Sequence, residues 1–132
     1  MKRIIKPVLS AAFFILLFSA TDAFAQEIKQ SNYRVQFAKG AKSAAQSRLI
    51  KKNAIHDVFF RARKGQRVTI KIVSTNGAAH FNFGAMNEFD VEPIQNNTTE
   101  YTGKLPFAGN GEYVIRVEAD KATKYTLTVS IK

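Results

Sequence analysis

Apolar and polar residues alternate along several short segments of the chain. The alternation is regular in residues 33–37 (YRVQF) and in residues 68–72 (VTIKI). In residues 125–131 (YTLTVSI) it continues for seven residues without interruption. A period of two places one set of side chains on a buried face and the other set in water, as in a half-buried β-strand. These segments are therefore predicted to be strands.

Glycine- and asparagine-rich pairs lie between the alternating segments and predict turns: Lys39-Gly40, Lys64-Gly65, Asn76-Gly77, Asn96-Asn97 and Gly109-Asn110-Gly111. After residue 25 no apolar stripe with helical spacing extends beyond two turns. Residues 38–52 are compatible with either a short helix or a strand. Short strands with frequent turns suggest an antiparallel sandwich or a partly closed barrel. We expect an all-β fold, a single antiparallel β-sandwich of about seven to eight strands.

The N-terminal segment has the three parts of a secretory signal peptide. Lys2, Arg3 and Lys6 precede a mostly apolar run at residues 8–20, and the segment ends with Ala23-Phe24-Ala25. Residues 1–25 are predicted to be a signal peptide and residues 26–132 one β-sandwich domain, which implies a periplasmic or secreted protein. The chain has no cysteine, so neither a disulfide nor a cysteine-linked lipid is available to it.

Basic residues are unevenly distributed along the chain. Removing Lys2, Arg3, Lys6 and Asp22 from the totals of 20 basic and 10 acidic residues leaves 17 and 9, a net charge of +8. Residues 34–71 contain eleven basic residues and one acid, whereas residues 72–132 contain five basic residues and seven acids.

Two interpretations of this basic region remain open: it keeps the protein soluble, or it attracts anionic envelope polymers such as lipid head groups and glycans. The residues predicted for polyanion binding are Arg48, Lys51, Lys52, Arg61, Arg63, Lys64 and Arg67. Nucleic acid is disfavoured as a partner by the predicted export.

The residue types needed for catalysis are sparse. There is no cysteine nucleophile and no G-x-S-x-G segment. His56 and Asp57 are adjacent, so on a strand their side chains would point to opposite faces, and His80 has no metal-binding spacing around it. The acids Glu88, Asp90 and Glu92 lack the glycine-bearing loop of a calcium site. We therefore expect no catalytic residue, no metal and no cofactor, and the protein is predicted not to be an enzyme.

Residues 105–117 (LPFAGNGEYVIRV) join a Pro- and Gly-rich stretch to an alternating run. Asn110-Gly111 favours a tight hairpin turn, since both residues tolerate positive φ. Tyr113 shares its parity with Ile115 and Val117, which places its ring in the core. Alternatively, residues 110–112 project as a tip, with Tyr113 supporting its base or presenting its hydroxyl at the rim.

Four stretches together resemble one known family. They are VQFAKGAKSAAQS (35–47), FFRARKGQRVTIKI (59–72), LPFAGNGEYVIRV (105–117) and KYTLTVSIK (124–132). They look like the pre-peptidase C-terminal type of β-sandwich and, within it, the bacterial periplasmic inhibitors of g-type lysozyme. The resemblance implies that a Ser-Gly-x-Tyr loop enters the substrate cleft of a g-type lysozyme.

The positions that match this loop are Asn110, Gly111, Glu112 and Tyr113, with Asn110 in place of the family's serine. Lys121 and Lys124 occupy the connection in which family members carry arginines, and are the expected secondary contacts. Because many lysozymes are basic overall, the more acidic C-terminal half is expected to face the partner. Besides inhibition, an envelope-binding module and an accessory domain without a ligand remain as alternatives.

Overall fold

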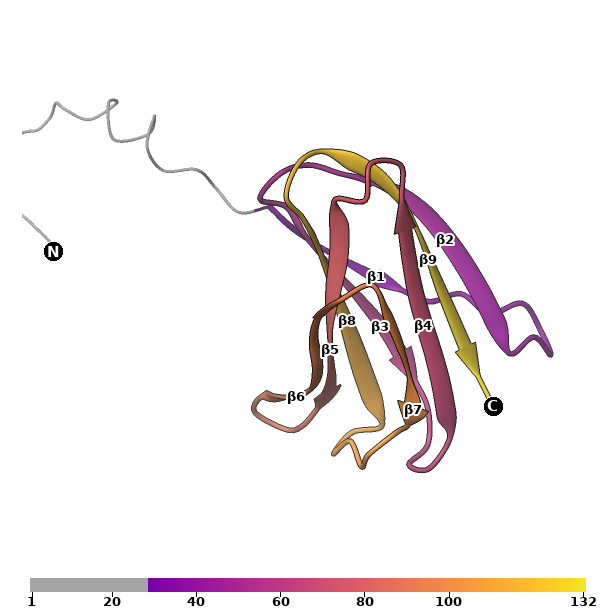
Figure 1. The fold of residues 1–132 in the computed structure, drawn as a ribbon. Helices are drawn as coiled ribbons and strands as arrows, with labels where there is room; N and C mark the ends of the chain where they lie inside the picture. Colours follow the sequence, from indigo (N-terminus) through magenta and orange to yellow (C-terminus); the bar gives the residue numbers. More distant parts are fainter. Residues whose placement is uncertain (1–28) are drawn as a thin grey trace, which may run out of the picture.

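The computed structural model describes residues 29–132, which form two β-sheets packed face to face (Figure 1). The predicted signal peptide and the first three residues of the predicted domain lie outside the described residues. The nine strands are β1 (Gln30–Arg34), β2 (Ser43–Ile50), β3 (Ile55–Arg61), β4 (Arg67–Ser74), β5 (Ala79–Met86), β6 (Val91–Thr98), β7 (Glu100–Lys104), β8 (Glu112–Ala119) and β9 (Thr123–Ile131). The prediction of an all-β sandwich is confirmed. Among these residues there is no helix of the length and apolar character needed to cross a bilayer.

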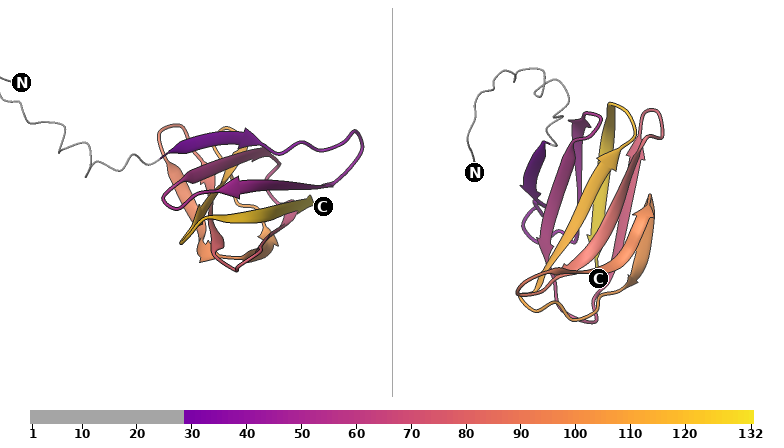
Figure 2. Two further views of the ribbon diagram at one scale, coloured as in Figure 1. Left: turned by 90° about the horizontal axis from the view of Figure 1, so that it is seen from above. Right: turned by 90° about the vertical axis from the view of Figure 1, so that its left-hand side faces the viewer.

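One sheet has the strand order β1-β3-β8-β5-β6 and the other the order β2-β9-β4-β7 (Figure 2). All neighbouring strands are antiparallel except β1 and β3, which pair in parallel. The expectation of a purely antiparallel fold is therefore wrong at this edge. Residues 38–52, for which the sequence was compatible with either a helix or a strand, contain the strand β2. This strand pairs with β9 from Ser43 to Ile50.

The strand count exceeds the predicted seven to eight because β6 and β7 are separate strands with only Thr99 between them. β6 pairs with β5 in one sheet, whereas β7 pairs with β4 in the other. The chain thus passes from sheet to sheet along an almost continuous extended segment. Pro93 within β6 is compatible with this position, because β6 is an edge strand and one of its sides needs no backbone donor.

The core lies between the sheets and is filled by the apolar side chains that point inward from the strands. Val68 and Ile70 of β4, and Leu127 and Val129 of β9, are almost completely buried, which confirms the alternation predicted for these segments. Phe60 of β3 stacks on both Phe83 and Tyr113, with ring centroids 5.9 Å and 5.5 Å away, and these two rings are also in contact with each other. Burying an aromatic ring of this kind stabilises the fold by about 1.5–3 kcal/mol.

The adjacent residues His56 and Asp57 face opposite sides of β3, as predicted from strand geometry. His56 is buried, and its Nδ1 lies 2.8 Å from the hydroxyl of Tyr125 in the opposite sheet. Burial, and secondly the charge of Arg48, lowers the pKa of His56, while burial raises the pKa of Tyr125 to about 12. Asp57 instead accepts two hydrogen bonds from Arg116, at 2.8 Å and 2.9 Å. Both side chains thus have structural partners and do not form a catalytic pair.

Candidate functional site

Three connections lie together at one end of the sandwich, which we call the loop end (Figure 1). They are the β3–β4 connection (residues 62–66), the β5–β6 connection (87–90) and the β7–β8 connection (105–111). The β2–β3, β4–β5 and β8–β9 connections lie at the opposite end. The residues matched to the inhibitory motif therefore belong to the loop end.

The turn predicted at Asn110-Gly111 is present, but it does not form a hairpin. The Gly111 N–H donates to the Ala108 carbonyl at 3.0 Å, and Gly111 has a φ of 76°. The flanking strands β7 and β8 belong to different sheets, so the connection crosses from one layer to the other. The hairpin expectation is wrong because an Asn-Gly pair favours a tight bend, whereas the pairing of the strands on either side depends on how the whole chain packs.

Hydrogen bonds hold the β7–β8 connection at both sides. The Leu105 N–H donates to the Gln66 carbonyl at 2.8 Å, and the Gly65 N–H donates back to the Leu105 carbonyl at 2.9 Å. Further along, the Gly109 N–H donates to Oδ1 of Asn87 at 3.0 Å. Leu105 itself is buried in the core. The connection is therefore tied to both neighbouring connections.

Tyr113 supports the β7–β8 connection from the core. Its ring is completely buried against Phe60 and Phe83, which confirms the prediction that it packs into the core. Its hydroxyl donates to the backbone carbonyl of Pro106, so the side chain reaches from the core to the start of the loop. Burial raises the pKa of Tyr113 and keeps the phenol protonated as a donor. Among the residues of the motif, Tyr113 thus has the role of an internal brace.

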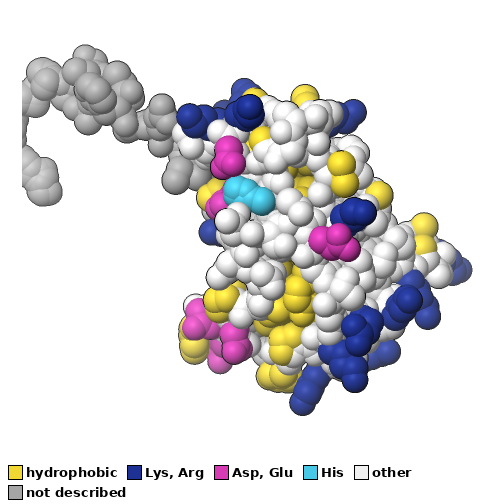
Figure 3. Space-filling model, viewed as in Figure 1, with side chains coloured by type: hydrophobic (Ala, Val, Ile, Leu, Met, Phe, Trp, Pro, Cys, Tyr) yellow, Lys and Arg dark blue, Asp and Glu magenta, His cyan; other side chains and the backbone are white. Residues whose placement is uncertain are grey.

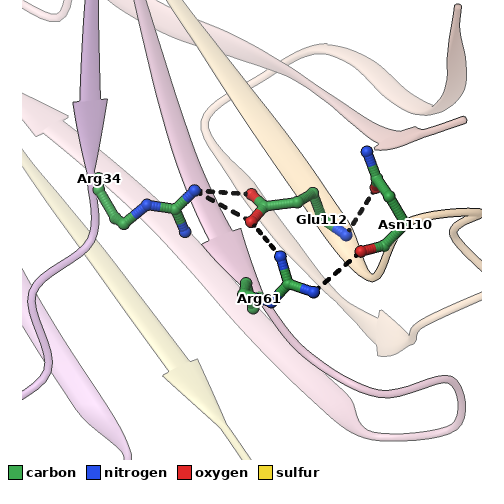
Figure 4. Close-up of polar contacts among 4 residues, drawn as sticks. All are labelled: Arg34, Arg61, Asn110 and Glu112. Carbon is green, nitrogen blue, oxygen red and sulfur yellow. Dashed lines mark hydrogen bonds and ion pairs between the residues drawn. The ribbon is translucent and has the colours of Figure 1, made fainter. Parts of the chain in front are cut away.

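Glu112 is held by two arginines (Figure 4). Nη2 of Arg34, in β1, donates to both carboxylate oxygens at 3.0 Å, and Nη1 of Arg61, at the end of β3, donates to Oε2 at 2.8 Å. Nη2 of Arg61 also donates to the backbone carbonyl of Asn110 at 3.1 Å. The Glu112 side chain is only 13% exposed. Its carboxylate therefore fixes the loop to β1 and β3 and is largely unavailable to a partner.

Asn110 is the residue of the motif that is most available to a partner. It is exposed, and its Oδ1 accepts the Glu112 N–H at 3.0 Å, which closes an Asx turn. Its amide nitrogen has no hydrogen-bond partner within the part of the chain that the structure describes, and it points away from the other labelled residues (Figure 4). A carboxylate or carbonyl of another molecule could accept a hydrogen bond there.

Sequence reasoning missed two exposed aromatic residues at the loop end. Phe107 is 64% exposed next to the turn, and Phe89 is 92% exposed in the β5–β6 connection. The sequence contained a signal for both, because each Phe stands in a polar or Pro- and Gly-containing connection outside any alternating run. The odd or even position of each Phe could not predict whether its side chain is exposed, since a connection, unlike a strand, has no defined buried face.

The residues predicted to bind polyanions do not form one surface. Arg61, Arg63, Lys64 and Arg67 lie at the loop end, where the first three line a shallow groove together with Lys42 and Lys132. Lys51 and Lys52 lie in the β2–β3 connection at the opposite end, and Arg48 places its guanidinium 3.7 Å from the Tyr33 ring centroid. β3 separates the two groups by its seven residues, about 23 Å.

The expected secondary contacts are also remote from the motif. Lys121 lies in the connection after β8 and Lys124 is the second residue of β9, whereas Asn110 precedes β8. The eight residues of β8 separate these positions by about 26 Å. The structure therefore brings Arg61, and not Lys121 or Lys124, to the side of the predicted loop.

The acids Glu88, Asp90 and Glu92 surround the turn of the β5–β6 hairpin, where the Asn87 N–H donates to the Asp90 carbonyl at 2.8 Å. Within residues 29–132 no three histidine or acidic side chains lie close enough together to hold a metal ion. These three acids are exposed and form a charged edge beside the β7–β8 connection.

Comparison with solved structures gives a consistent family assignment. No protein-family model and no curated protein matches the chain. Among solved structures, the periplasmic inhibitor of g-type lysozyme from Aeromonas hydrophila has 29% identity and a TM-score of 0.68. The corresponding inhibitors from Salmonella Typhimurium and Escherichia coli (the latter a mutant) have 30% and 26% identity, each with a TM-score of 0.58. Each comparison covers 79% of this chain and 98–99% of the other.

The fold and its loop end thus define a small β-sandwich protein of the same class as these three structures. The chain belongs to the family of periplasmic inhibitors of g-type lysozyme. The resemblance seen in the sequence is confirmed by the fold of residues 29–132.

Proposed function

We propose that this protein is a periplasmic, non-enzymatic inhibitor of a g-type lysozyme, and that it acts by inserting the β7–β8 connection into the substrate cleft. The observation that carries the proposal is the way in which the exposed Asn110 is presented. Tyr113 braces the loop from the core, and Arg34 and Arg61 hold it through Glu112. A loop that is already rigid loses little conformational entropy when it binds.

Charge at the loop end supports the same proposal, though not in the way the sequence suggested. The more acidic C-terminal half, which carries the loop, was expected to face the partner. In the folded chain, however, Arg61, Arg63 and Lys64 border the loop that this half carries. A basic border is complementary to the acidic catalytic cleft of many lysozymes. Residues from both halves of the sequence would thus take part in the contact.

The proposal is tested by measuring how a g-type lysozyme clears a suspension of bacterial cell walls. We expect the purified mature protein to suppress the clearing at low micromolar concentration, which corresponds to a binding free energy of about −8 kcal/mol. A lysozyme of another structural class, assayed in parallel, serves as the specificity control. Clearing that proceeds unchanged with a molar excess of the protein would overturn the proposal.

The groove at the loop end supports a second candidate function, the binding of anionic envelope polymers. Lys42, Arg63, Lys64 and Lys132 line it together with Arg61. Of these side chains only Arg61 forms an ion pair within the described residues. Clustered cations that lack internal partners attract phosphate- or carboxylate-bearing polymers, and this attraction weakens as salt screens it.

For this second function we expect Arg63→Glu/Lys64→Glu to lose at least about tenfold of the binding to lipopolysaccharide vesicles at low ionic strength. Lys51→Glu/Lys52→Glu makes the same change of charge at the opposite end and serves as the matched control. Co-sedimentation with the vesicles gives the bound fraction. Equal losses in both variants would assign the binding to net charge and not to the groove.

A further inference from the structure

The loop end carries an unusual concentration of exposed apolar side chains. Five large apolar residues are strongly exposed within residues 29–132: Leu49, Val73, Phe89, Val91 and Phe107. Three of them, Phe89, Val91 and Phe107, belong to the β5–β6 hairpin or to the β7–β8 connection. Single exposed apolar residues are ordinary, but neighbouring exposed aromatic residues are typical of contact surfaces.

The segments that carry Phe89 and Phe107 are fixed to one another. Asn87 is the link, because its Oδ1 accepts the Gly109 N–H at 3.0 Å while its own N–H donates to the Asp90 carbonyl at 2.8 Å. One residue thus stabilises the β5–β6 turn through its backbone N–H and attaches the β7–β8 connection to it through its side chain. Both aromatic rings therefore project from segments whose backbones have a defined relative position.

Opposite charges flank this apolar region. Glu88, Asp90 and Glu92 are exposed on the side of the β5–β6 hairpin, and Arg63 and Lys64 are exposed on the side of the β3–β4 connection. None of these five forms an ion pair within residues 29–132. Figure 3 shows acidic side chains at the lower left of the molecule and a basic group at the lower right, with apolar side chains in the region between them.

From this arrangement we propose that the loop end is an oriented docking surface for the rim of a g-type lysozyme cleft. Phe107 enters beside Asn110, and Phe89 packs against the rim. The basic side faces the acidic cleft, and the acidic edge faces the basic surface outside it. This inference rests on the proposed function, since the partner is the same, and it adds aromatic anchors and a fixed orientation. Charges of opposite sign on the two sides disfavour the reversed orientation.

The anchors are tested with Phe89→Ser and Phe107→Ser, measured by inhibition of the g-type lysozyme. We expect each substitution to raise the inhibition constant about tenfold, because buried aromatic anchors dominate protein contacts. Leu49→Ser and Val73→Ser are the matched controls, since they remove exposed apolar side chains from β2 and β4, outside the loop end. We expect these controls to inhibit within about twofold of the wild type.

Hydrogen exchange of the wild-type complex gives a second measurement that does not depend on the folding of any variant. Residues 87–90 and 105–111 are expected to gain protection when lysozyme is added, while residues 51–54 at the opposite end keep their exchange rates. If the wild type inhibits but the Phe variants match their controls and residues 87–90 gain no protection, the oriented surface is wrong and the proposed function stands. If the wild type does not inhibit, both proposals fall.

Discussion

Replacing Tyr113 with alanine is expected to lower the free energy of unfolding by about 4 kcal/mol, since large-to-small changes of buried aromatic residues cost about 3–5 kcal/mol. Tyr113 is completely buried and its ring stacks on Phe60 at 5.5 Å. The substitution removes this packing and also the hydrogen bond to the Pro106 carbonyl. Urea-induced unfolding, followed by the circular dichroism of the sheets, measures the change. A loss below about 1 kcal/mol would contradict the role of Tyr113 as a core residue.

Two conservative variants distinguish a tyrosine hydroxyl that holds the β7–β8 connection from one that only bridges the two sheets. Tyr113→Phe keeps the ring and removes the hydroxyl that binds Pro106, whereas Tyr125→Phe removes the hydroxyl that lies 2.8 Å from His56. Each loses one hydrogen bond, partly buried at Tyr113 and buried at Tyr125, worth about 1 kcal/mol. Only Tyr113→Phe is expected to weaken lysozyme inhibition as well, because only Tyr113 contacts the β7–β8 connection. Equal inhibition by both variants would show that the hydroxyl of Tyr113 does not position the loop.

The fold could be predicted from the sequence wherever strands are buried on one face. The alternation in residues 68–72 and 125–131 identified β4 and β9, since each of these strands buries one set of alternate side chains and leaves the other set more exposed. β6 gave no such signal because it is an exposed edge strand that contains Pro93. The parallel pairing of β1 with β3 was also unpredictable, because it joins segments 25 residues apart at their first pair, Gln30 and Ile55.

At the candidate site, local features were predictable and long-range contacts were not. The positive φ of Gly111 and the burial of Tyr113 follow from a turn signal and from parity within one strand. The ion pairs of Glu112 with Arg34 and Arg61 join residues 78 and 51 positions apart, and no local pattern encodes them. Glu112 stays predicted as part of the inserted tip, and these contacts add that its carboxylate ties the β7–β8 connection to β1 and β3.

Introducing tryptophan at Gly111 is expected to weaken lysozyme inhibition at least about 100-fold, equivalent to about 2.8 kcal/mol of binding free energy. A Cβ at this position lies 3.4 Å from Nη2 of Arg61, so a bulky side chain would displace the guanidinium from the Asn110 carbonyl as well as enlarge the tip. A cleft that accepts a narrow loop has no room for an added indole. Inhibition constants from the cell-wall clearing assay measure the effect.

Gly77→Trp is the matched control because Gly77 has a φ of 70°, close to the 76° of Gly111, and lies in the β4–β5 connection at the opposite end. Both substitutions place a side chain in the left-handed region, at a cost of about 1–2 kcal/mol in stability. Their melting temperatures should therefore fall by similar amounts. Backbone strain then cannot explain a loss of inhibition that occurs only in Gly111→Trp, and such a difference assigns the contact to the β7–β8 connection. If the two variants inhibit equally well, the loop does not enter the cleft, and the contact with lysozyme must lie on another part of the sandwich.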